Sequence, residues 1–221
     1  MAPVIIAIDG PAGSGKSSVS KQAAREKGFG YLDTGAAYRA LAWASLNLDG
    51  YSLEQLESKD LAAEFAYTIS IDPDNYWVKV GNTDVTEAIR QSEVAEYVSQ
   101  VAHIPAVRSY MKALTHRIVA ESGLAGVIVE GRDITTVVAP EAPVRILLTA
   151  NEAVRLKRRS AELSESTAAS VMRQVSERDA SDSKVVDFMT PAPGVQLVDT
   201  SDLNFNQSVS AVIALIEQGL S

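Results

Sequence analysis

Eight residues near the N-terminus have the types and spacing needed to bind a phosphate chain. Residues 10–17 read Gly-Pro-Ala-Gly-Ser-Gly-Lys-Ser and match the pattern G-x4-G-K-[ST] in full. The backbone amides of residues 13–16 can curl around a phosphate because few side chains block the approach. Lys16 brings a positive charge to the β- and γ-phosphate oxygens, and the Ser17 hydroxyl is the expected Mg²⁺ ligand. The segment, called the phosphate loop below, predicts a bound nucleoside triphosphate with Mg²⁺.

The neighbouring segments supply the context that this motif requires. Residues 4–8 form a short apolar run with β-branched side chains, which predicts a strand buried on both faces. Residues 17–27 have helical spacing and end before Gly28. The motif thus follows a strand and opens a helix, so a glycine-rich turn that only joins the two is the weaker interpretation.

The phosphate loop alone leaves the class of protein open among a small-molecule kinase, a GTPase switch and an ATPase that drives motion. The chain has no Asn-Lys-x-Asp string, the element expected of a GTPase that reads guanine. The run Val127-Ile128-Val129-Glu130 faintly resembles the strand of a motor that ends in an acidic residue. The Gly131-Arg132-Asp133 string that follows favours a different class.

The rest of the chain alternates predicted strands and helices, which indicates an α/β fold with a mainly parallel sheet. Leu41, Trp43, Ala44 and Leu48 are candidate core residues of the second helix. Asn151 is the expected N-cap of a helix that runs through Arg159. The predicted strands are 29–32, 127–129, 144–148 and 196–198. The predicted helices are 36–48, 92–121, 151–159, a helix that ends at about 179, and 206–218. The helix 92–121 is expected to break near Pro105, and the helix that ends at about 179 follows a polar break at 164–167.

The middle of the chain has a different pattern. Residues 67–71 and 76–80 alternate apolar and polar side chains, and Asp72-Pro73-Asp74-Asn75 between them is a strong turn signal. An antiparallel hairpin within a strand–helix series predicts an inserted subdomain, roughly residues 51–90.

Composition narrows the possible functions. The chain has 221 residues with a formal net charge of −8, which argues against broad binding to nucleic acid or to an anionic membrane. It has no cysteine, which excludes disulfides and thiolate sites and fits a cytoplasmic protein. No apolar run reaches the ~18 residues that span a bilayer. A signal peptide is not expected, and the two histidines, His103 and His116, have no metal-binding spacing.

Beyond the phosphate loop, several strings resemble those of bacterial cytidylate kinases, in order and over nearly the whole chain. The Asp-Thr-Gly…Tyr-Arg and Gly-Arg-Asp strings make the resemblance specific. The matching strings are 8–17, Leu32-Asp33-Thr34-Gly35-Ala36-Ala37-Tyr38-Arg39, Ser99-Gln100-Val101-Ala102, Pro105-Ala106-Val107-Arg108, Glu130-Gly131-Arg132-Asp133-Ile134, Ala142-Pro143-Val144, Glu177-Arg178-Asp179 and Asp182-Ser183.

The resemblance implies a P-loop parallel-sheet core flanked by helices, with a small antiparallel nucleotide-binding insertion and a short lid. It implies one nucleoside monophosphate kinase domain over residues 1–221, with the insertion at about 51–90 and the lid at about 155–186. The implied substrates are ATP with Mg²⁺ and CMP or dCMP, which would give ADP and CDP or dCDP. We expect a monomer without nucleic-acid or membrane partners.

The resemblance also implies roles for individual residues. Arg39 and Arg132 would bind the acceptor phosphate, because guanidinium forks suit phosphate oxygens. Asp133 and Arg108 would read the amine and the acceptor atoms of cytosine, assisted by Thr34. The sugar would be held by Ser99, Arg178 and Asp182, and the triphosphate by Gly10, Pro11, Ala12, Gly13, Ser14, Gly15, Lys16, Ser17 and Ser18.

Arg155 and Arg158 fall on one side of the predicted helix 151–159, where they could neutralise the phosphoryl group in transfer. A charged, solvated helix surface is the alternative interpretation. The chain departs from the family pattern at Thr135, where a second glycine is expected, and at Val185, where an arginine often stands. These departures bear on the acceptor site and on the lid.

Two other functions stay open from the sequence. One is a P-loop kinase for UMP, AMP or a non-nucleotide alcohol. The other is a nucleotide-binding regulatory module without phosphotransfer.

Overall fold

The computed structural model describes residues 2–162 and 189–221, which divide into two compact units. The first unit consists of residues 1–31 together with residues 124–221, and the second unit consists of residues 32–123. The predicted break at 164–167, the helix to 179 and most of the predicted lid lie outside the described residues.

The first unit is built on a five-stranded sheet with the strand order β2-β6-β1-β7-β8. Strand β1 (Val4–Asp9) pairs in parallel with β6 (Gly126–Gly131) and with β7 (Val144–Thr149), and β7 pairs in parallel with β8 (Gln196–Asp199). Strand β2 (Gly30–Asp33) lies at the edge beside β6. The predicted α/β fold with a parallel sheet is confirmed.

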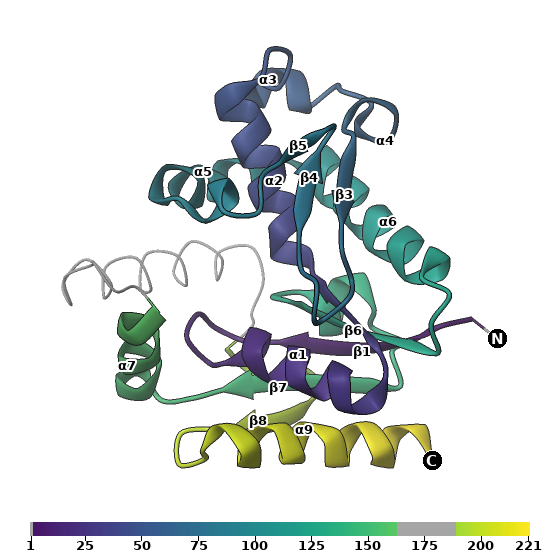
Figure 1. Cartoon of the computed structure of the whole chain (residues 1–221), viewed down its shortest axis with the longest axis vertical. Coiled ribbons are helices and arrows are strands. Elements are labelled where there is room, and N and C mark those ends of the chain that lie inside the picture. Colours follow the sequence, from purple (N-terminus) through teal and green to yellow (C-terminus); the bar gives the residue numbers. More distant parts are fainter. Residues whose placement is uncertain (1, 163–188) are drawn as a thin grey trace. The chain divides into compact units, whose positions relative to one another are not determined.

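Helices flank this sheet. Helix α1 (Lys16–Lys27) follows β1 and packs against α9 (Phe205–Leu220), so that the two lie side by side (Figure 1). Helix α7 (Glu152–Glu162) follows β7, and Asn151 caps it by accepting a hydrogen bond from the amide of Val154, as predicted. A five-residue π-helical turn, η2 (Ile134–Val138), packs against β1, β6 and β7.

The core of the first unit explains why the apolar runs become strands. Ile6, Ile8, Ile128 and Ile146 are fully buried, together with the other apolar residues at the centres of β1, β6 and β7. Because helices or turns cover both faces of a parallel sheet, its central strands carry continuous apolar sequence rather than alternation.

The second unit contains the small antiparallel sheet β3-β4-β5. Strand β3 (Tyr67–Ile69) pairs with β4 (Val78–Val80), as the hairpin pattern predicts, and β4 pairs with β5 (Thr83–Asp84), which the pattern does not reveal. These strands fall inside the range predicted for the insertion, 51–90. The helices of the unit are α2 (Thr34–Asn47), α3 (Leu53–Leu56), α4 (Leu61–Glu64), η1 (Ala88–Arg90), α5 (Ser92–Ala102) and α6 (Pro105–Glu121).

The break predicted near Pro105 separates α5 from α6, because Pro105 occupies the first turn of a new helix, where its missing N–H costs nothing. The prediction that Leu48 is a core residue was wrong. Helix α2 ends at Asn47, the Leu48 backbone is extended, and 42% of its surface is exposed. The end of the helix removes Leu48 from the buried face that Leu41 and Ala44 share.

Candidate active site

The phosphate loop connects β1 to α1 and has the backbone shape that its glycines allow. Gly13 and Gly15 have φ angles of +75° and +86°, a region that side chains disfavour. A Cβ atom on Gly13 would also lie 2.5 Å from the backbone oxygen of Arg155. Gly15 is the N-cap residue of α1 and, having no side chain, makes no capping hydrogen bond. The first amides of α1 therefore form a terminus that suits an anion.

The Lys16 side chain folds back onto the phosphate loop. Its Nζ atom donates a hydrogen bond to the Pro11 carbonyl oxygen at 3.4 Å, and the residue is half-buried. The bond is at the long limit for a hydrogen bond. An anionic ligand on the loop would offer the ammonium stronger acceptors.

Arg155 and Arg158 of α7 reach the phosphate loop. Arg155 donates from Nη1 to the Ala12 carbonyl oxygen at 3.0 Å, and Arg158 donates from Nη1 to the Ser14 carbonyl oxygen at 3.1 Å. Arg158 also holds Thr200, with bonds of 2.9 Å to its hydroxyl and to its carbonyl oxygen. In this structure the two guanidiniums bind loop carbonyls and so fix the loop's backbone. Contact between either arginine and a phosphate stays a prediction.

Ser17 is paired with an acidic residue that follows the β6 apolar run. Its hydroxyl donates to Glu130 Oε1 at 2.7 Å, and the Tyr31 hydroxyl donates to the same oxygen at 2.8 Å. Glu130 is only 3% exposed. In phosphate-loop nucleoside triphosphatases a loop hydroxyl and an acid at the end of a strand hold Mg²⁺.

The oxygen donors of Ser17 and Glu130 fit Mg²⁺, which prefers oxygen ligands and usually keeps waters and substrate phosphates around it. No cluster of three or more His, Asp or Glu side chains suited to a metal occurs within residues 2–162 and 189–221.

The Gly-Arg-Asp string lies where β6 ends, and the π-helical turn η2 follows it. Arg132 and Asp133 are half-buried. The Asp9 carboxylate, at the end of β1, accepts hydrogen bonds from the Ile134 amide at 2.9 Å, the Thr135 amide at 2.8 Å and the Thr135 hydroxyl at 2.6 Å. Burial raises the pKa of Asp9 above its ordinary value, against the opposing effect of these donors.

In the second unit, Arg39 of α2 is held by Asp33. Arg39 Nη2 lies 2.7 Å from Asp33 Oδ2, and both side chains are 14% exposed. Asp33 also caps α2 by accepting a hydrogen bond from the Ala36 amide. The Tyr76 hydroxyl, from the segment between β3 and β4, lies 3.4 Å from Asp33 Oδ2. One carboxylate thus starts the helix and orients the guanidinium on its next turn.

The other predicted acceptor residues of the second unit lie on different helices. Thr34 begins α2, Ser99 lies on α5 and Arg108 on α6, and all three are half-buried. Ser18 is exposed on the first turn of α1 in the first unit. Arg178, Asp182 and Val185 lie outside the described residues.

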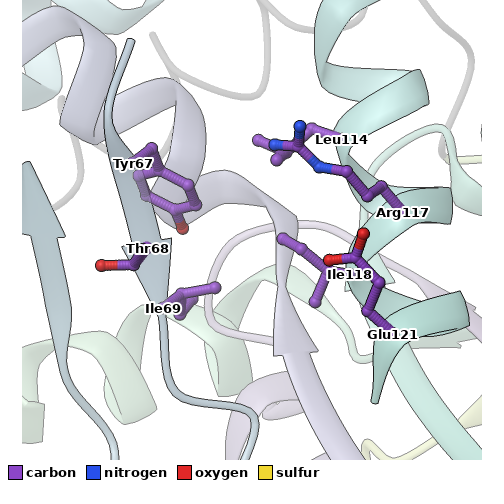
Figure 2. A pocket seen from close by; sticks show the side chains of 7 residues that line it. All are labelled: Tyr67, Thr68, Ile69, Leu114, Arg117, Ile118 and Glu121. Carbon is purple, nitrogen blue, oxygen red and sulfur yellow. The ribbon is translucent and has the colours of Figure 1, made fainter. Parts of the chain in front are cut away.

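A pocket of about 270 Å³ lies between β3 and α6 (Figure 2). Apolar atoms of Ile69, Leu114 and Ile118 form much of its wall, and Arg117 and Glu121 of α6 stand at its side. Its lining includes none of the predicted site residues that the structure describes.

Sequence reasoning missed three acidic residues that organise these groups. In the sequence, Glu130 stands out as the acid after a motor-like strand and as part of a matching string, whereas Asp9 and Asp33 stand out only as parts of matching strings. A usable signal existed for each, since an acid at the carboxyl end of a buried parallel strand lies at the edge where ligands bind. Thr200, which accepts hydrogen bonds from Arg158, has no sequence pattern that would identify it as part of the site.

None of the helices in the described ranges combines the length and the hydropathy needed to span a bilayer.

Comparison with known proteins agrees with this geometry. The sequence profile of the family described as "Cytidylate kinase" matches residues 6–218. The cytidylate kinase of Cutibacterium acnes is 42% identical over 217 residues, which cover 97% of this chain and 96% of that protein. The cytidylate kinase of Desulfitobacterium hafniense is 39% identical over 215 residues, covering 95% of this chain and 91% of that protein.

A solved structure of an uncharacterized protein from Eubacterium ventriosum is similar in fold alone, with a TM-score of 0.51, 12% identity, and coverage of 97% of this chain and 98% of that one. The family profile and the relatives each span almost the whole sequence, phosphate loop and Gly-Arg-Asp string included. The chain therefore belongs to the cytidylate kinase family.

Proposed function

We propose that this protein transfers the γ-phosphoryl group of ATP to CMP or dCMP, giving ADP and CDP or dCDP. Family membership makes the chain an ATP-dependent phosphotransferase. The observation that carries the proposal is the phosphate loop in its strand–loop–helix context, with Lys16 over the loop and the Ser17–Glu130 pair beside it. Relatives across the whole chain are named cytidylate kinases.

In the proposed step, an oxygen of the acceptor phosphate attacks the γ-phosphorus of ATP. A new P–O bond forms, the bond from the γ-phosphorus to the bridging oxygen breaks, and ADP leaves with that electron pair. The acceptor phosphate is already a dianion near neutral pH, so no strong general base is needed. Catalysis then depends on positioning and on neutralising charge, which the loop amides and Lys16 supply.

Ser17 and Glu130 would hold Mg²⁺, which when bound neutralises charge on the β- and γ-phosphate oxygens. Glu130 orients the Ser17 hydroxyl through their 2.7 Å hydrogen bond. Tyr31 in turn orients Glu130.

The acceptor residues follow from the family resemblance. Arg39 and Arg132 would bind the phosphate of CMP, and Asp33 presents Arg39 in a fixed direction. Asp133 would accept a hydrogen bond from the cytosine amine, whereas the O4 of uracil would repel it. The remaining assignments are base contacts by Thr34 and Arg108, sugar contacts by Ser99, Arg178 and Asp182, and charge neutralisation by Arg155 and Arg158.

The proposal includes the division predicted from the sequence, with an insertion at about 51–90 and a lid at about 155–186. A lid would exclude water during transfer, which otherwise would hydrolyse ATP. We also propose that the enzyme is a monomer, which light scattering of the purified protein tests.

A coupled assay tests the function. ADP formation is followed with ATP, Mg²⁺ and each of CMP, dCMP, UMP and AMP in turn. We expect ADP formation that depends on CMP or dCMP and is much slower with UMP or AMP. Preference for another acceptor would identify another P-loop kinase. Slow, acceptor-independent hydrolysis, or none, would contradict the proposal and favour a regulatory module.

A further inference from the structure

The carboxylate of Asp9 joins the two loops that the proposed reaction uses in the first unit. Asp9 directly precedes Gly10 of the phosphate loop, and its three hydrogen-bond donors belong to Ile134 and Thr135, which directly follow Asp133. Asp9 is 2% exposed and Thr135 is 4% exposed. We call this group, Asp9 with its donors from Ile134 and Thr135, the Asp9 latch.

The backbone carbonyl of Thr135 is also hydrogen-bonded, by Arg145. Arg145 of β7 donates from Nη1 to the Thr135 carbonyl oxygen at 3.2 Å and from Nη2 to the Pro193 carbonyl oxygen at 3.1 Å. The turn closes with the Val138 amide on the Asp133 carbonyl oxygen at 3.0 Å and the Ala139 amide on the Ile134 carbonyl oxygen at 2.8 Å. The backbone of Asp133 is therefore part of a turn whose position depends on Thr135.

The threonine at position 135 is one of the two departures of this chain from the pattern it resembles, in which a glycine follows Gly-Arg-Asp-Ile. A glycine would keep an amide donor to Asp9 but would lose the hydroxyl bond of 2.6 Å. Burying a carboxylate is costly unless its oxygens are hydrogen-bonded. The hydroxyl thus adds a third donor to a buried acid that would otherwise have two.

We infer that Thr135 is a positioning residue for acceptor binding, which acts by holding the Arg132–Asp133 segment to the phosphate loop through the Asp9 latch. The inference rests on the proposed function, in which Arg132 and Asp133 contact CMP. ATP contacts the phosphate loop itself, which Gly13, Gly15 and the two α7 arginines already constrain. Weakening the latch should therefore affect the acceptor more than ATP.

The test compares two isosteric changes one residue apart. Thr135→Val removes the latch hydroxyl. Thr136→Val is the matched control, since the Thr136 hydroxyl is buried but has no hydrogen-bond partner among the described residues. We expect Thr135→Val to raise KM for CMP about fivefold to tenfold, a factor that corresponds to the loss of one ordinary hydrogen bond, with KM for ATP changed less than about twofold. Thr136→Val should leave both constants unchanged, and Thr135→Ser should restore KM for CMP.

A second readout does not depend on activity. Amide hydrogen exchange in peptides that cover residues 132–139 should be faster in Thr135→Val than in the wild-type protein or in Thr136→Val. Thr135→Gly, which keeps the amide donor, replaces Thr135→Val if the valine variant does not fold, and should behave in the same way.

The outcomes separate the two proposals. A wild-type protein that forms no ADP with CMP overturns the proposed function, and exchange in residues 132–139 then decides on the latch alone. If the wild-type protein is active but Thr135→Val matches Thr136→Val in KM for CMP and in exchange, the latch does not position the acceptor segment. An equal rise in the KM values for CMP and ATP would also overturn the inference.

Discussion

The Ser17 hydroxyl donates a 2.7 Å hydrogen bond to Glu130, a carboxylate that is nearly completely buried at the end of β6. The two residues are 113 positions apart and meet because β1 and β6 are parallel neighbours, so that the segments after them share one edge of the sheet. This pair places an acid beside the hydroxyl expected to bind Mg²⁺.

Glu130→Gln should raise the Mg²⁺ concentration needed for half-maximal activity. The amide keeps the size of the side chain and can still accept a bond from Ser17, but it lacks the charge that attracts the cation. We expect a rise of about tenfold or more, the size of one lost charged contact. A Mg²⁺ titration at fixed ATP measures it, with the exposed Glu26→Gln as the control. An unchanged Mg²⁺ dependence would mean that Glu130 only orients Ser17.

Lys16→Ala should abolish turnover while the protein stays folded. In the proposed mechanism the ammonium neutralises charge on the transferred phosphoryl group, and losing one such group costs at least about 100-fold in kcat. Steady-state kinetics and circular dichroism measure the two effects. Lys27→Ala, at the far end of α1, removes only a surface ion pair with Glu217 and should leave kcat unchanged. Normal turnover by Lys16→Ala would overturn the role of Lys16.

Asp133→Ala should reduce the preference for CMP over UMP, because no carboxylate would then accept the cytosine amine or repel the uracil O4. Asp133→Asn should shift the preference further toward UMP, since an amide N–H can donate to that oxygen. The ratio of kcat/KM for the two substrates is the measurement, and we expect it to fall by about tenfold or more. An unchanged ratio in both variants would show that the base is read elsewhere.

Asp33→Ser should separate the two roles of Asp33. Both variants lose the ion pair with Arg39, but serine can still cap α2, so Asp33→Ser should be more stable to unfolding than Asp33→Ala by about 1 kcal/mol. Both variants release Arg39 and should raise KM for CMP without affecting KM for ATP. Urea unfolding and steady-state kinetics measure these effects. Equal losses of stability in the two variants would contradict the capping role.

Asp9 should give stability a pH dependence opposite to that of an ordinary paired carboxylate. Its pKa is raised by burial, so between the unfolded value near 3.8 and the raised folded value the folded protein binds more protons than the unfolded chain. The free energy of unfolding therefore falls as pH rises through this window, and the contribution is fully present below it. Urea unfolding at several pH values should show this decline in the wild-type protein relative to Asp9→Asn. Parallel curves would contradict the raised pKa.

Local patterns determined much of this protein. The buried strand before Gly10, the helix after it and the Asn151 cap depend on neighbouring residues and on the period of the apolar pattern, and all were predictable. So was the hairpin of β3 and β4, where the turn residues 72–75 interrupt two alternating segments. The family strings also identified the kind of enzyme, because their order along the chain is a property of the sequence itself.

Only the tertiary structure decided which side chains share a hydrogen bond. The pairing of β1 with β6 and β7 brought Glu130 to Ser17 and Asp9 to Thr135, and the packing of α7 brought Arg155 and Arg158 to the backbone of the phosphate loop. These contacts join residues more than 100 positions apart in the chain, so no local period records them. They also explain how the fold accommodates Thr135, because its hydroxyl donates a hydrogen bond to the buried Asp9 carboxylate. Asp9 lies near Thr135 because β1 pairs with β6, and the residues on either side of Thr135 do not record this pairing.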